Sequence, residues 1–176
     1  MIRFALVVAT IILAGPASSQ HMQHQHAPAN TYGAMTGREI KALSAEQIAD
    51  LQAGRGMGLS LPAELNGYPG PKHVLELADG LALTTSQRDV TTRFIEQMTA
   101  EAMPIGARII AHEKALDRLF VERRATEVAV RTAIDDIARA QEELRFTHVK
   151  FHLAMAAALT PQQSARYAEL RGYATR

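Results

Sequence analysis

The stretch of sequence that decides the fold runs from residue 85 to residue 121 and reads TSQRDVTTRFIEQMTAEAMPIGARIIAHEKALDRLFV. A stripe recurs along it at spacings of only three and four residues: Val90, Phe94, Met98, Ala102, Ile105, Ile109, His112, Leu116 and Phe120. These spacings place side chains on one face of an α-helix. The stretch therefore predicts one amphipathic helix, roughly 55 Å long at about 1.5 Å per residue. Pro104 should kink it, because its ring crowds the preceding turn.

A second stripe with the same spacings follows a short polar connection at residues 123–126. It consists of Val130, Ile134, Ile137, Gln141, Leu144, His148, Phe151, Met155 and Leu159. Two long amphipathic helices joined by so short a link bury their stripes by folding back on each other. The expected fold is all-α: a long antiparallel helical hairpin flanked by short helices. We expect these short helices at 44–53 and 71–82, and from Thr160 to near Gly172.

The same short motif, L-T-x-x-Q, stands before each of two expected helices. The first copy is LTTSQ, with Leu83, Thr84 and Gln87, and the second is LTPQQ, with Leu159, Thr160 and Gln163. The threonine hydroxyl can accept from an early backbone N–H, while the glutamine three residues later reaches back to the cap. Each copy alone predicts no more than a helix start.

The first nineteen residues have the pattern of a cleavable secretory signal: Arg3, an apolar run over residues 4–14, then small residues. The apolar run is too short for a membrane span, and an uncleaved anchor is the alternative. After this segment (1–19), we expect a disordered His-rich tail (20–40), a short helix with a Gly- and Pro-rich loop (41–70), and a hairpin domain (71–176).

The composition of the chain and the motifs that it lacks exclude several classes of function. Loss of the signal removes Arg3 and leaves a formally neutral chain, so net charge favours neither nucleic acid nor an anionic membrane. The chain has no cysteine, which excludes disulfides and thiolate chemistry. It also lacks the G-x-S-x-G and H-E-x-x-H motifs. We therefore expect a protein that is not an enzyme and requires no cofactor.

Two L-T-x-x-Q motifs flanking a long helical hairpin, in an exported chain with Met and His but no Cys, resemble the Spy/CpxP superfamily of LTxxQ periplasmic proteins. The resemblance covers roughly residues 75–173. The run from His148 to Tyr173 looks most like the periplasmic heavy-metal sensor and resistance branch.

The resemblance implies a curved homodimer in the periplasm. It implies a metal-responsive or envelope-stress binding protein with a membrane-bound signalling partner. The alternative is an ATP-independent holdase chaperone for unfolded clients, consistent with the lack of a phosphate-binding GxxxxGK[ST] loop. A structural envelope protein is a third hypothesis. For all three we expect no nucleic-acid partner and no membrane span after signal cleavage.

The leading candidate for a metal site is His148 with His152, four residues apart on one helical face, and Met155 three residues further. Two imidazoles at this spacing can bind one divalent transition metal such as Zn, Ni or Cu. Counting outward from a turn near residue 124 places Glu96 or Glu101 opposite as a third ligand. The alternative is that both histidines are partly buried and hydrogen-bonded to neighbours.

Four other histidines lie elsewhere in the sequence. His21, His24 and His26 cluster in the expected tail, where such a tract can capture Cu(II), Ni(II) or Zn(II), or serve merely as a polar tail. The count from the turn places His112 opposite about residue 136, well short of His148. We therefore expect His112 to be a core or interface residue.

Overall fold

A computed structural model describes residues 32–173, so the expected signal segment and His21, His24 and His26 lie outside the described residues. The elements in chain order are η1 (Gly33–Met35), α1 (Ala45–Gln52), α2 (Leu61–Glu64), α3 (Pro71–Glu76), α4 (Thr85–Val121), α5 (Glu127–Ala158) and α6 (Pro161–Arg171). Residues 35–173 belong to one compact unit, to which everything below refers. The described chain is all-helical, which confirms the expected fold class.

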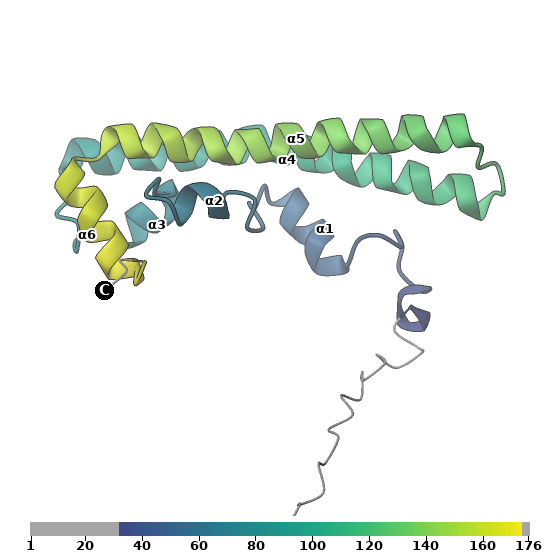
Figure 1. The fold of residues 1–176 in the computed structure, drawn as a ribbon, viewed down its shortest axis with the longest axis horizontal. Coiled ribbons are helices and arrows are strands. Elements are labelled where there is room, and N and C mark those ends of the chain that lie inside the picture. Colours follow the sequence, from purple (N-terminus) through teal and green to yellow (C-terminus); the bar gives the residue numbers. More distant parts are fainter. Residues whose placement is uncertain (1–31, 174–176) are drawn as a thin grey trace, which may run out of the picture. The chain divides into compact units, whose positions relative to one another are not determined.

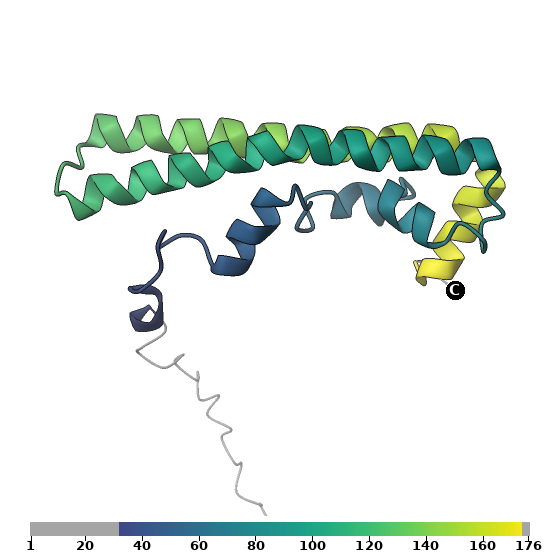
Figure 2. The same ribbon diagram turned by 180° about the vertical axis from the view of Figure 1, so that it is seen from behind.

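The two long helices α4 and α5 pack against each other along their length as an antiparallel hairpin, shown from two sides in Figures 1 and 2. Phe94 of α4 meets Phe151 of α5, with ring centroids 6.0 Å apart. Glu101 pairs with Lys150 across the same interface. Both contacts confirm the register that was counted from the turn. Helix α4 continues without interruption through Pro104.

Side-chain caps start the helices where the sequence predicted them. Ser44, Thr84 and Thr160 each accept a hydrogen bond from the backbone N–H of a glutamine three residues later, whose side chain returns to the cap. These reciprocal bonds satisfy amide groups that every helix N-terminus leaves unpaired. At the other end of α6, Gly172 adopts φ +72°, the left-handed geometry that commonly closes a helix.

The two L-T-x-x-Q motifs also bind each other. The Gln87 amide donates to Gln163 Oε1 at 2.8 Å, and the Gln163 amide donates to Gln87 Oε1 at 3.0 Å. The same amide nitrogens reach the carbonyls of Ala158 (3.1 Å) and Leu81 (3.2 Å). The motif glutamines therefore cap their own helices and tie together the open end of the hairpin.

The segment before α4 lies along one side of the hairpin and brings α1, α2 and α3 against it (Figure 1). It approaches α4 closely at Gly106, where an added Cβ would lie 2.1 Å from the Leu51 carbonyl oxygen. Only glycine allows this contact. One apolar cluster forms there, and a second forms around α3, α5 and α6.

Two details differ from the sequence prediction. The helix expected over 71–82 ends at Glu76, and the chain turns through Ala82, whose φ is +48°. A residue in that conformation cannot continue an α-helix. The segment 54–70, expected as a loop, contains the short helix α2. In the described part of the chain, no helix combines the length and apolar character that crossing a membrane requires.

Candidate functional site

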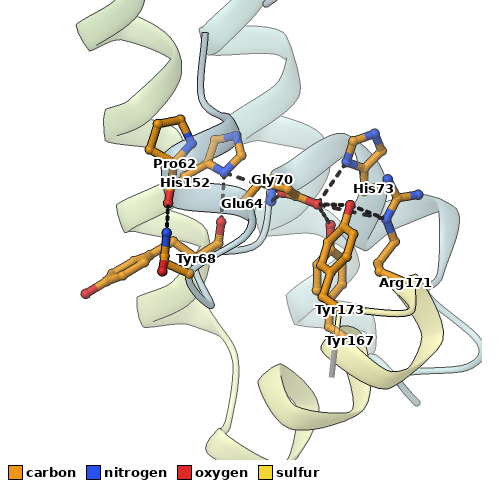
Figure 3. A network of polar contacts seen from close by, with 10 residues as sticks. Pro62, Glu64, Tyr68, Gly70, His73, His152, Tyr167, Arg171 and Tyr173 are labelled. Carbon is orange, nitrogen blue, oxygen red and sulfur yellow. Dashed lines mark hydrogen bonds and ion pairs between the residues drawn. The ribbon is translucent and has the colours of Figure 1, made fainter. Parts of the chain in front are cut away.

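The buried carboxylate of Glu64 receives polar contacts from α3, α5, α6, the chain just after α6 and the loop after α2 (Figure 3). Its Oε1 accepts hydrogen bonds from the hydroxyls of Tyr167 and, at 3.3 Å, Tyr173, and lies 3.3 Å from His73 Nδ1 and 3.9 Å from Arg171 Nε. Its Oε2 accepts from the Gly70 N–H at 2.9 Å and lies 3.6 Å from His152 Nδ1. Glu64 therefore joins parts of the chain that are distant in sequence.

The contacts of Glu64 keep it ionised. Burial raises the pKa of its carboxyl, but hydrogen bonds from Tyr167 and Gly70, together with nearby His73 and His152, hold the pKa below its usual value. Burial, followed by the hydrogen bond to Glu64 and the negative charge of that carboxylate, raises the pKa of the Tyr167 hydroxyl. The pair is therefore a carboxylate that accepts and a phenol that donates.

Local structure explains how Glu64 reaches this position. It is the last residue of α2, which starts at Leu61 with Pro62 in its first turn. The chain then reverses through Gly67, at φ +87°, and returns to Gly70. A Cβ at Gly70 would lie 2.9 Å from His152 Cε1, so glycine lets the returning loop approach that imidazole.

His148 and His152 lie one turn apart on α5, as the sequence predicted, and both line a cavity of about 500 Å³. His152 Nδ1 lies 2.8 Å from the Tyr68 carbonyl oxygen. His148 is 3% exposed, and its Nε2 is buried without a hydrogen-bond partner among the described residues. Its ring is close to Gly56, where an added Cβ would lie 3.2 Å from Nδ1.

The environment of His148 favours the neutral imidazole. Burial, and then the proximity of His152, lowers the pKa of His148. A neutral imidazole is the form that binds a transition metal. Glu64 and His73 line the same cavity as the two histidines, so nitrogen and oxygen donors share one space.

The structure distributes the other predicted ligands differently. Met155 is fully buried in an apolar cluster, and its sulfur accepts from the Thr91 hydroxyl at 3.6 Å. Glu96 is exposed on α4, and Glu101 is engaged by Lys150. The half-buried His112 lies further along α4 and does not line the cavity of His148.

The carboxylate beside the histidine pair is therefore Glu64, which sequence reasoning missed together with His73. Glu64 stands in a Gly- and Pro-rich segment without helical periodicity, so no local signal marks it as buried. Tyr167, Arg171 and Tyr173 lie within the run that carries the family resemblance. Across residues 32–173, no three His, Asp or Glu side chains are arranged to hold one metal ion.

Comparison of this chain with models of protein families, with curated proteins and with solved structures found no match.

Proposed function

We propose that this protein is a periplasmic metal-responsive binding protein of the Spy/CpxP type, and that its metal site is built from His148 and His152 with Glu64. The observation that carries the proposal is the buried Nε2 of His148, which has no hydrogen-bond partner among the described residues, in a side chain that lines one cavity together with His152 and Glu64.

The unpartnered Nε2 of His148 supports the proposal because a buried imidazole nitrogen without a hydrogen bond destabilises the folded protein. Leaving a buried polar atom without a hydrogen bond costs about 1–3 kcal/mol. A transition-metal ion would use this nitrogen as a ligand and remove the penalty. Burial, and then the proximity of His152, lowers the pKa of His148 and so favours its neutral form.

The residues present fit such an ion in their chemistry. Two imidazoles and a carboxylate form a donor set that suits Zn(II), Ni(II) and Cu(II). The Tyr68 carbonyl contacts His152 Nδ1, the kind of outer hydrogen bond that orients a ligating imidazole and leaves its Nε2 to the metal. Since the described residues hold no ready three-ligand group, binding requires a side-chain movement, with Glu64 or His148 turning toward the ion.

The test is calorimetric titration with Zn(II), Ni(II) and Cu(II), using the chain without its signal segment. His21, His24 and His26 are replaced by alanine, so that heat from the tail cannot imitate the site. We expect micromolar or tighter binding of one ion, abolished in His148→Ala and in His152→Ala. His112→Ala is the matched control and should bind as the parent does. Equal affinity in all the variants would refute the site.

A second candidate function is ATP-independent binding of unfolded proteins. It is favoured by large apolar side chains exposed on the hairpin, among them Phe146 (63% exposed), Leu153 (50%) and Ile134 (50%). Exposed apolar residues in such number mark surfaces that bind partners, clients or a second copy of the chain. The expected homodimer would use part of this surface.

The two functions separate in one comparison. If the protein is a holdase, Phe146→Ser with Leu153→Ser should weaken suppression of the aggregation of a reduced, unfolding client, while metal binding is unchanged. Light scattering of the client measures this directly. Loss of aggregation suppression in His148→Ala instead would show that the histidines support the fold and not a separate metal site.

A further inference from the structure

The two oxygens of Glu64 face different parts of the molecule (Figure 3). Oε1 takes its contacts mainly from α6 and the residues just after it: the Tyr167 and Tyr173 hydroxyls and Arg171 Nε. Oε2 takes its contacts from the cavity wall: the Gly70 N–H and His152 Nδ1. One carboxylate thus connects α6 to the wall that carries the histidine pair.

Helix α6 depends on few attachments. It has 11 residues, a length at which an isolated helix is marginal in water, and Tyr167 is its one buried residue. Besides the Gln163 amide bonds and the burial of the Tyr167 ring, the contacts with Glu64 hold it in place. A weaker acceptor at Oε1 would therefore loosen α6.

We propose that Glu64 acts as a latch for α6: it couples the binding of a divalent cation at His148 and His152 to the release of that helix. This inference rests on the proposed function. A cation bound at the two histidines attracts the negative charge of the Glu64 carboxylate. Oε1 then becomes a poorer hydrogen-bond acceptor for the two tyrosine hydroxyls. The same positive charge repels Arg171, which now lies 3.9 Å from Oε1.

Release of α6 would have a definite result. The Tyr167 ring packs in the apolar cluster that contains Val74, Ala78, Leu81, Leu83, Met155 and Leu159. Departure of the helix uncovers part of that cluster and offers an apolar surface to a partner. Occupation of the metal site is thereby converted into a new binding surface without any change in the long hairpin.

The coupling must be reciprocal. If the cation weakens the docking of α6 by some factor, weaker docking of α6 must strengthen cation binding by the same factor. Allosteric couplings of this kind amount to about 5–150-fold, and loss of one hydrogen bond to a charged group falls within that range. We expect an effect of about tenfold.

Hydrogen exchange of the α6 backbone amides is the test, measured with and without saturating Zn(II) in the protein whose three tail histidines are alanines. Zn(II) should accelerate exchange in α6 by about tenfold and leave the middle of α4 unchanged. Tyr167→Phe should raise exchange in α6 without metal and bind Zn(II) about tenfold more tightly by calorimetry. Arg166→Gln, which changes an α6 side chain paired with Glu169 and not with Glu64, is the matched control and should show neither effect.

Each result decides a different point. Zn(II) binding with unchanged exchange in α6 would overturn the latch and leave the metal site standing. Absence of Zn(II) binding in the parent protein would overturn the proposed function and the coupling with it. If Tyr167→Phe does not fold, Tyr173→Phe, which removes the half-buried second hydroxyl, should show the same two changes in smaller size. Unaltered exchange and affinity in Tyr173→Phe would then refute the latch.

Discussion

Replacing Glu64 by glutamine is the most informative single change, because it keeps the shape of the side chain and removes its charge. The glutamine carries one acceptor oxygen where the carboxylate has two. Its amide nitrogen must face either the Gly70 N–H or the tyrosine hydroxyls, and both sides of Glu64 present donors. At least one buried donor loses its acceptor.

The size of the effect follows from these contacts. A buried donor without an acceptor costs about 1–3 kcal/mol, and the bond from Tyr167 to the remaining oxygen weakens because its acceptor is no longer charged. Loss of the charge also removes a desolvation cost, but the lowered pKa of Glu64 shows that its favourable contacts outweigh burial. We expect Glu64→Gln to lose about 2–4 kcal/mol of the free energy of unfolding, or roughly 10 °C in melting temperature.

Urea denaturation with a metal chelator at neutral pH measures this loss. Glu101→Gln is the matched control, since Glu101 is exposed and pairs with Lys150, a contact worth at most about 1 kcal/mol. The pKa of Glu64 is lower in the folded chain than its ordinary value of 4.5. Its contribution is therefore complete above that pH and is lost as the pH falls through the folded pKa. If Glu64→Gln costs no more than Glu101→Gln at neutral pH, the account of the buried carboxylate is refuted.

Three further changes test other parts of the structure. Burial raises the pKa of Glu113 above 4.5, so its charged form opposes folding. Glu113→Gln should therefore raise the free energy of unfolding at neutral pH, measured by urea denaturation, and this gain should disappear well below pH 4.5; a loss of stability would contradict this. Gly106→Ala places a Cβ against the Leu51 carbonyl and should cost about 1–3 kcal/mol, with faster hydrogen exchange in α1; unchanged exchange there would mean that α1 does not pack as described. Gln87→Ala removes a cap and both hydrogen bonds between Gln87 and Gln163, so that the Gln163 amide nitrogen keeps only the Leu81 carbonyl. We expect a loss of about 2 kcal/mol in thermal unfolding, whereas a loss below about 0.5 kcal/mol would show that the two motifs do not support each other.

The long helices could be predicted because their signals are local. The stripe from Val90 to Phe120 and the caps at Thr84 and Thr160 each act within a few residues, and the bounds of α4 follow from them directly. Helix α3 ended earlier than predicted because the chain leaves helical geometry at Leu77, the C-cap, and then turns through Ala82 before the Thr84 cap. A pattern of apolar residues does not reveal such a turn.

The candidate site could be predicted only in part. His148 and His152 share a helix, so their spacing was enough to place them on one face. Glu64 has partners up to 109 residues away in the sequence, and only tertiary packing brings them together. The count from the turn correctly placed Glu101 opposite this part of α5, but the Glu101 carboxylate forms an ion pair with Lys150.

In the proposed metal site, His148 and His152 together bind one transition-metal ion in the cavity beside Glu64. X-ray absorption spectroscopy of the Zn(II)-loaded protein, with the three tail histidines replaced by alanine, tests it most directly. Two imidazole nitrogens should be present in the first coordination shell of the zinc in the parent protein and in His112→Ala. In His152→Ala we expect one imidazole nitrogen or no bound zinc. A spectrum that is the same in His152→Ala as in the parent protein would contradict the claim.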